Sequence, residues 1–399
     1  MKKINKKIFS HKLMENNINY DDIRILKKFI EKKPIFTNNK KVLEFENKWS
    51  KWLGVKYSVF VNSGSSANLL SIAYLKNKFK KGEIIVPTLT WSSDIASVFH
   101  NNLKPVFADI DLKNLALSVN DIKKKTNKNT IAIFLTHILG INGLSNELIE
   151  FCKKKKIILI EDCCESHGAK FKQKKIGNFG TISNFSFYFA HHMTTIEGGM
   201  ISTNSKEIYE ICRMLRSHGL VREVKNRKIK TFYEKKYKDL NPQFIFSMPS
   251  YNVRSTEINA VLGLNQIKRL NQNITKRNIN FKYFLKNLNK EKYFSEFDLK
   301  GQSNYAFIII FNKKFRNKRF RFKFEKTLIK NNIEFRRGTS GGGNQMRQPY
   351  VRNMMNFSEK DFKKFSNSEI VHHYGYYIGN YPNLKKTKIL QITNILNNI

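Results

Sequence analysis

Residues that could do chemistry gather in short segments, each of which follows a run of β-forming residues. The first segment is Asn62-Ser63-Gly64-Ser65-Ser66, which opens a helical pattern. Glycine lets another group approach the backbone closely, and serine hydroxyls together with helix N-terminal amides bind anions. The same residues also make an ordinary turn and helix N-cap, so this segment alone leaves both interpretations open.

Trp91 and Asp162 each follow an apolar, β-forming run. Trp91 can offer a flat face to an aromatic ring, although packing in the core is an equal alternative. A carboxylate directly after an apolar strand costs free energy unless it is paired. A pyridinium nitrogen would be a suitable partner for Asp162, and a helix N-cap or a structural ion pair is the alternative.

The segment from Asn184 to Gly199 reads NFSFYFAHHMTTIEGG and contains two adjacent histidines. Histidine can move protons near neutral pH. Adjacent side chains of an extended segment point to opposite faces, so only one of the two can face a given site. The residue pattern alone does not select between them; the resemblance described below places His191 at the site as the candidate proton carrier, and we then take His192 as structural.

A β-sheet is required to place these segments close together in space. Short apolar runs at 55–61, 83–87, 104–110, 130–138 and 156–162 predict strands, and amphipathic helical segments separate them. Two further strands are expected within 182–189 and 198–204. Strands buried on both faces and joined by helices indicate a mainly parallel sheet in a layered α/β domain. Ligands of such sheets bind at the carboxyl ends of the strands, where the chemical segments lie.

A long helical stretch begins near Arg254, and a smaller α+β unit follows it, with a strand at 305–311 and helices at 320–332 and 387–399. We therefore expect a large domain at 1–265, with the N-terminal segment 1–40 packing on it. A small C-terminal domain is expected at 266–399.

Charge is the most unusual bulk property, since 73 Lys and Arg against 31 Asp and Glu give a net charge of +42. Such a balance favours nucleic acid or an anionic membrane surface as partner. The excess is spread along the chain and accompanies abundant Asn and Ile, which A/T-rich codons supply. We therefore expect no nucleic-acid partner. The sequence has no apolar leader and no stretch of spanning length, which predicts a cytoplasmic protein without membrane insertion.

The four cysteines show neither a CxxC pair nor ligand spacing, so no metal site and no disulfide framework are expected.

From about Phe36 onward, the order of these motifs resembles the DegT/DnrJ family of sugar-nucleotide aminotransferases. The motifs that carry the resemblance are NSGSSAN, the Thr-Trp loop, EDCCESHGA, FSFYFAHHMTTIEGG and YNVRSTEINAVLGLNQI. The resemblance implies a fold-type-I transferase, with a large three-layer α/β/α domain and a smaller α+β domain. It also implies pyridoxal or pyridoxamine 5'-phosphate as cofactor and a homodimer with shared active sites.

The resemblance assigns roles to individual residues. Trp91 would stack on the cofactor ring, Asp162 would pair with the ring nitrogen, and Glu165 would lie near the ring oxygen. Asn252 would reach the phosphate from the neighbouring subunit. The remaining phosphate contacts would be Ser65, Ser66 and Ser186.

One departure from the family pattern changes the expected chemistry. Members that transaminate have a lysine six residues before the acidic residue of the Glu-Gly-Gly segment, and here that position holds His191. Imidazole cannot form the Schiff base that a lysine amine forms, so the cofactor would be held noncovalently.

Two branches of the family share this change, and both are 3-dehydratases of nucleotide-linked 4-keto-6-deoxy sugars. One branch uses a CDP-sugar and an iron–sulfur cluster held by cysteines after the histidine. Cys212 is the only such cysteine here. The motifs HHMTTIEGG, RSHG and YNVR resemble the other branch, which uses a GDP-sugar and no metal.

The sequence therefore predicts removal of the C3 hydroxyl of a nucleotide-linked 4-keto-6-deoxyhexose, with glutamate as amino donor, for deoxysugar or O-antigen biosynthesis. His191 would act as acid and base. His218 is a further candidate near the substrate, although a capping role is equally compatible with its position. Two alternatives stay open, namely transamination of another keto sugar and a noncatalytic regulator.

Overall fold

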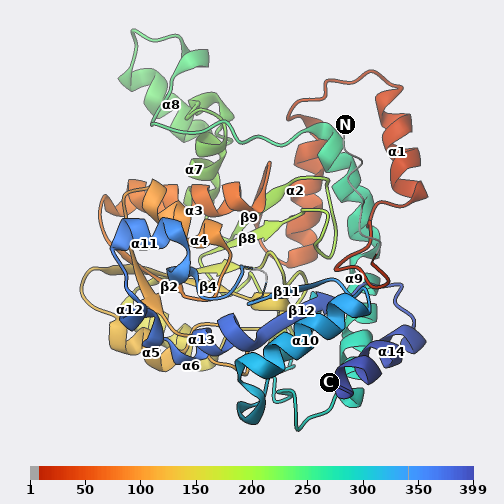
Figure 1. Ribbon diagram of the computed structural model, residues 1–399. Helices are drawn as coiled ribbons and strands as arrows, with labels where there is room; N and C mark the ends of the chain where they lie inside the picture. The colour runs from red at the N-terminus through yellow and green to blue at the C-terminus, as the bar shows by residue number, and fades with distance from the viewer. Residues whose placement is uncertain (1–8, 340) are drawn as a thin grey trace, which may run out of the picture.

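A seven-stranded sheet forms the centre of the computed structural model, which describes residues 9–339 and 341–399 (Figure 1). The strand order is β1-β9-β8-β5-β4-β2-β3. Only β9 runs antiparallel to its neighbours, so the predicted mainly parallel sheet is confirmed. The strands are β1 (Tyr57–Val61), β2 (Glu83–Pro87), β3 (Lys104–Ala108), β4 (Thr130–Thr136), β5 (Ile158–Asp162), β8 (Ile182–Ser186) and β9 (Gly199–Thr203).

Helices cover both faces of this sheet, because its strands are apolar on both sides. One apolar core lies between the sheet and α3 (Gly64–Phe79), α4 (Ser92–His100), α7 (Lys206–Arg216), α11 (Pro349–Met355) and α12 (Glu359–Lys363). A second core lies between the opposite face and α2 (Lys40–Leu53), α5 (Val119–Lys125), α6 (Asn146–Lys155) and α9 (Glu257–Asn287). The expected three-layer α/β/α arrangement results.

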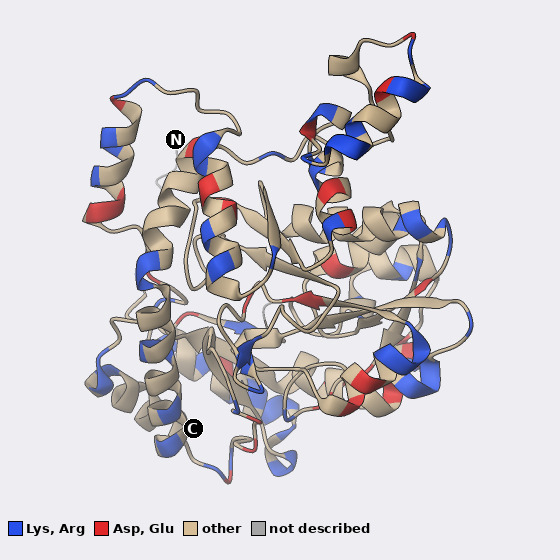
Figure 2. Ribbon diagram, turned by 180° about the vertical axis from the view of Figure 1, so that it is seen from behind, with Lys and Arg blue, Asp and Glu red and all other residues tan. Residues whose placement is uncertain are grey.

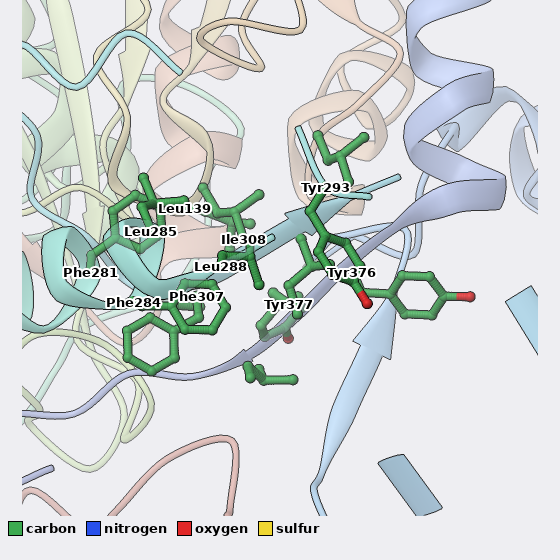
Figure 3. Packing of buried hydrophobic residues seen from close by; sticks show 14 of the residues in the cluster. Leu139, Phe281, Phe284, Leu285, Leu288, Tyr293, Phe307, Ile308, Tyr376 and Tyr377 are labelled. Carbon is green, nitrogen blue, oxygen red and sulfur yellow. The ribbon is translucent and has the colours of Figure 1, made fainter. Parts of the chain in front are cut away.

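A smaller antiparallel sheet carries the third core. Its order is β10 (Ala306–Ile310), β12 (Gly375–Gly379) and β11 (Phe335–Arg337). The C-terminal half of α9 packs on it, and the rings of Phe284 and Phe307 stack with centroids 4.4 Å apart (Figure 3). The helices α10 (Lys318–Lys330), α13 (Ser366–Tyr374) and α14 (Lys386–Asn397) contribute to the same unit. A two-stranded ribbon, β6 (Lys170–Phe171) and β7 (Lys174–Lys175), stands apart from both sheets.

The N-terminal segment connects both parts of the fold. His11 bonds to the carbonyl of Gly379 at the end of the small sheet, with a distance of 2.9 Å. Helix α1 (Tyr20–Ile30) is held to α9 by the buried Asp22, which accepts hydrogen bonds from Gln266 and Arg269. The predicted boundary at residue 265 falls inside the continuous helix α9 and stays a prediction. The first eight residues of the predicted segment 1–40 lie outside the described residues.

A helical arm projects from the body beyond α7 (Figure 1). It contains α8 (Arg227–Lys236), a helix with no buried residue. Several large apolar side chains on and near it are exposed, namely Phe232, Leu240, Phe244 and Phe246. Exposed apolar side chains grouped in this way mark a surface that contacts another molecule.

Basic residues are distributed over helices and loops throughout the fold, as expected from the sequence (Figure 2). Within the described part of the chain, no helix combines the length and the apolar character that crossing a bilayer requires.

A buried ion pair fixes the base of the arm to the sheet. Arg216 donates to Glu46 at 2.6 Å and to the carbonyl of Phe60 at 2.9 Å, and both ionic side chains are at most 3% exposed. The backbone of Arg216 also accepts a hydrogen bond from Val253. Arg213 lies farther from the same carboxylate, at 3.8 Å.

We predict that Arg216→Met lowers the free energy of unfolding by about 3–5 kcal/mol, because it leaves Glu46 buried without its cation. Arg213→Met is the matched control and should cost about 1 kcal/mol or less. Urea unfolding followed by circular dichroism measures both values. Equal losses for the two variants would contradict the dominant role of Arg216.

Candidate active site

A cavity of about 660 Å³ opens at the carboxyl end of the large sheet. Thr136, Asp162 and Ser186, which are the last residues of β4, β5 and β8, line it together. Another side of the cavity is lined by Arg336 and Tyr377 of the small sheet and by Tyr305, which directly precedes β10. Other lining residues include Lys12, Ser63, Gly64, Ser65, Trp91, Ser93, His137, Cys164, Glu165, Tyr188, His191, Glu197 and Glu334. The cavity therefore lies between the two sheets of the fold.

The serine-rich loop forms the N-terminus of α3 within this cavity. Ser63 is the N-cap and accepts a hydrogen bond from the amide of Ser66. A Cβ on Gly64 would lie 2.5 Å from the Cβ of Ser186, and one on Gly199 would lie 2.1 Å from the carbonyl oxygen of Ser63. The two glycines thus allow three segments of the chain to meet. Free amides at a helix N-terminus beside serine hydroxyls suit a phosphate group.

The predicted phosphate residues differ in their positions. Ser65 is exposed and lines the cavity with Ser186. Ser66 is not among the lining residues, and its hydroxyl donates to Asn62 at 2.6 Å. Because the amide of Ser66 already donates to Ser63, a contribution of Ser66 to anion binding would require a change of rotamer of its hydroxyl.

Asp162 is 3% exposed at the floor of the cavity. One carboxylate oxygen accepts a hydrogen bond from the side chain of Asn68 at 3.0 Å, and the other accepts from the amide of Cys164 at 2.8 Å. Among the described residues, no lysine, arginine or histidine forms an ion pair with Asp162. A buried carboxylate held only by neutral donors can pair with a cationic ligand.

Trp91 and Glu165 lie at the edges of the same cavity. Trp91 follows β2, caps α4 and is 51% exposed, so its ring is available to a ligand rather than packed in the core. Glu165 is fixed by the amide of Leu139, which donates to it at 2.8 Å.

His191 and His192 separate at a turn rather than in an extended segment. The amide of His191 donates to the carbonyl of Tyr188 at 3.0 Å, which identifies a turn, and our assumption of an extended backbone here was wrong. His191 lines the cavity, whereas His192 is fully buried and bonds to Ser303. The two side chains nevertheless lie in different surroundings, one at the cavity and one in the core.

The surroundings of His191 keep its imidazole neutral. Burial lowers its pKa to about 4, the positive charge of Arg277 adds to this effect, and the charge of Asp162 opposes it. Its Nδ1 is buried without a hydrogen-bond partner. Nε2 is therefore the ring nitrogen that can reach a ligand. A neutral imidazole with one free nitrogen can accept a proton.

A second polar cluster beside the cavity is already satisfied. His137, Glu161 and Cys163 bring potential metal-ligand atoms close together. Glu161, however, accepts hydrogen bonds from Gly177, Phe179 and Gly180 as well as from His137 at 3.2 Å, and Nδ1 of His137 accepts from the amide of Gly143. These hydrogen bonds connect the end of β5 to the neighbouring loops, so the cluster has a structural role.

Two residues that we predicted for the site do not line the cavity of their own chain. His218 and Asn252 are exposed at the base of the arm, where Ser217 and Asn252 form a bridge pair. The side chain of Asn252 accepts a hydrogen bond from Arg254 at 3.0 Å. The amide of His218 donates to Tyr251 at 2.7 Å.

Sequence reasoning missed several residues of the site. Asn68 and Asp94, which support Asp162 from behind the cavity, are the fifth residue of α3 and the third residue of α4. Tyr377 lies in β12 and Tyr305 directly precedes β10, and both line the cavity. The signal for the first two was their position near the starts of helices that follow strand ends. The sequence contained no signal for the tyrosines, because their role depends on how the two sheets face each other.

Known proteins resemble the whole chain. Residues 17–397 match the DegT/DnrJ/EryC1/StrS aminotransferase family. A GDP-4-keto-6-deoxy-D-mannose 3-dehydratase of Escherichia coli O55:H7 is 37% identical over 283 residues, which cover 69% of this chain and 73% of the relative.

Two solved structures extend the similarity to the fold. The E. coli GDP-4-keto-6-deoxy-D-mannose-3-dehydratase with bound hydrated PLP has a TM-score of 0.87 and 29% identity, covering 98% of this chain and all of the other. A GDP-4-keto-6-deoxymannose-3-dehydratase with a trapped PLP-glutamate geminal diamine has a TM-score of 0.86 and 30% identity, covering 97% and 100%. The predicted fold is confirmed.

The depressed pKa of His191 predicts how stability depends on pH. An unfolded histidine, with a pKa of about 6.5, binds a proton between pH 6.5 and 4, whereas folded His191 does not. The unfolded state therefore gains protons as the pH falls through this window, and the free energy of unfolding decreases. At pH 5 the contribution of one such group is about 1–2 kcal/mol.

His191→Asn should reduce the difference in unfolding free energy between pH 7.5 and pH 5 by about this amount. Urea unfolding at both pH values measures it. His11→Asn, a buried histidine whose pKa is also lowered to about 4 but which does not line the cavity, should give a similar reduction and serves as the control. A pH dependence unchanged in the His191 variant would show that this imidazole is not kept neutral.

Proposed function

Because the chain belongs to the DegT/DnrJ/EryC1/StrS aminotransferase family, we propose that it is a pyridoxal-phosphate-dependent 3-dehydratase of a nucleotide-linked 4-keto-6-deoxyhexose. One observation carries the proposal. A neutral histidine, His191, lines the same cavity as the unpaired carboxylate of Asp162, at the position where transaminating members have lysine. The similar E. coli enzyme, which binds hydrated PLP, supports the same conclusion.

The residues present fit the cofactor. Gly64 and Gly199 let the N-terminus of α3, Ser63 and Ser186 pack closely against one another, and these segments form a cradle. This cradle with Ser65 and Ser186 would hold the phosphate, and Ser66 would add its hydroxyl after a change of rotamer. Trp91 would stack on the ring, Glu165 would lie near the ring oxygen, and Asp162 would accept a hydrogen bond from the protonated ring nitrogen. When bound, pyridoxal phosphate supplies an electron sink conjugated to the reacting carbons.

His191 would perform the proton transfers. Its Nε2 would accept a proton at the carbon next to the ring, and the resulting imidazolium would donate this proton to the departing C3 hydroxyl, which would leave as water. Asp162 would keep the ring nitrogen protonated and so stabilise the negative charge that develops. The amino group and two electrons would come from glutamate, which is oxidised to 2-oxoglutarate. Hydrolysis would then release the amino group as ammonia, and the sugar would have lost one oxygen.

The proposal includes a homodimer with shared cavities. The exposed apolar residues of the arm provide a surface for a second copy, and His218 and Asn252 lie at the base of this arm. From there, Asn252 would reach the phosphate in the partner's cavity and His218 would lie near its substrate. A cytoplasmic location, which agrees with four free thiols, and a role in deoxysugar or O-antigen synthesis complete the proposal.

We predict that His191→Asn abolishes dehydration but retains cofactor binding, because it removes the proton carrier and leaves the cradle unchanged. The assay combines protein, pyridoxal phosphate, glutamate and GDP-4-keto-6-deoxymannose, and measures ammonia and the mass of the sugar. The wild type should release ammonia and a sugar one oxygen lighter. An amino sugar would instead identify a transaminase, and full activity of the variant would exclude His191 as the essential base.

Mixed dimers test the shared cavity. His191→Asn and Asn252→Ala should each be inactive alone. When the two variants are co-expressed and the mixed dimers are purified through separate tags, about half of wild-type activity should return, because one of the two cavities in each mixed dimer receives both intact residues. If no activity returns although mixed dimers form, Asn252 acts within its own chain or has no role at the site.

A further inference from the structure

A second acidic side chain lies directly behind Asp162. Asp94 is the third residue of α4 and is completely buried. It does not line the cavity, but it is a hydrogen-bond neighbour of Asp162. Two carboxyl groups therefore share the floor of the proposed cofactor site, although only one of them can meet a ligand.

The groups around Asp94 are neutral hydrogen-bond donors. Thr136 donates to it at 2.7 Å, and Thr90 donates to the same oxygen. The side-chain amide of Asn68 donates to Asp94 at 2.7 Å and to Asp162 at 3.0 Å, so one amide orients both carboxyl groups. This arrangement fixes the distance between the two acids without adding a positive charge.

Two adjacent carboxylates without a cation cannot both ionise at low cost. Burial, followed by the charge of Asp162, raises the pKa of Asp94 well above its ordinary value. The other titratable groups that face Asp94 are Cys164 and Tyr350, and burial raises the pKa of each. All neighbours of Asp94 except Asp162 are therefore neutral at neutral pH.

We propose that Asp94 is a positioning residue that remains a neutral carboxylic acid, so that Asp162 alone carries the negative charge that meets the ring nitrogen. A protonated ring beside a single carboxylate gives a balanced pair, whereas two carboxylates would leave one negative charge uncompensated in a buried site. The acid proton of Asp94 also gives Asp162 a hydrogen bond on the side away from the cavity. This inference rests on the proposed role of Asp162.

Infrared difference spectroscopy tests the protonation state directly. At pH 7.5, wild-type protein minus Asp94→Asn should contain the carbonyl stretch of an un-ionised carboxylic acid, both without and with pyridoxal phosphate. A carboxylate band in its place would overturn the proposal. Because the cofactor-free protein gives this result as well, the measurement remains valid even if the proposed function is wrong.

The cofactor provides a second, independent readout. Asparagine has the shape and charge of a neutral aspartic acid, so Asp94→Asn should leave the midpoint of the ring-nitrogen titration, followed by absorbance, within about 0.3 pH units of the wild type. A downward shift of about one unit or more would mean that the variant removed a negative charge, and would overturn the proposal. Asp94→Leu, which cannot hydrogen-bond, should weaken cofactor affinity about tenfold.

Asp162→Asn separates the two hypotheses. If Asp162 meets the ring nitrogen, this variant should lower the ring-nitrogen pKa by more than one unit. An unchanged titration would reject the role of Asp162, whereas the infrared result for Asp94 would stand.

Discussion

The site depends on one buried carboxylate that has no cation of its own. Asp162 ends β5 at 3% exposure, and its oxygens are held by an amide of Asn68 and a backbone N–H. Neutral donors fix the orientation of a carboxylate without neutralising it, so the favourable partner is a cationic ligand. The sheet topology provides this position, because parallel strands bring their carboxyl ends to one edge. The glycine contacts, the serine loop and the tryptophan gather at the same edge.

The second requirement is a base that is neutral before the reaction. Arg277 is buried between α9 and the small sheet, where it donates to the carbonyl of Tyr305. Its charge, added to burial, favours the neutral form of His191 and of the neighbouring His167 and His192. The charge of Asp162 acts on His191 in the opposite direction. The small sheet and α9 would therefore contribute to the proposed proton transfer through electrostatics as well as through the shape of the cavity.

The sequence was sufficient to predict the strands, the edge of the sheet at which the cavity lies and several residues that line it, because these depend on local periodicity and on strand ends. It could not predict contacts that depend on packing. Asn68 and Asp94 meet Asp162 only because β1, β2 and β5 belong to one sheet with non-sequential order. Tyr305 and Tyr377 enter the cavity from the other sheet. The turn at His191 was missed because the aromatic run before it is typical of a continuing strand.

The exchange of lysine for histidine also changes the charge balance of the cavity floor. A lysine at position 191 would be a cation close to Asp162, whose charge already acts on His191, and that cation would favour ionisation of this carboxyl group. A neutral imidazole at the same position adds no positive charge to the cavity floor. Under the proposal above, the proton is retained where burial is complete and no ligand can reach, which is Asp94 rather than Asp162. Neutral states of both His191 and Asp94 would then leave Asp162 as the single charge that meets a cationic ligand.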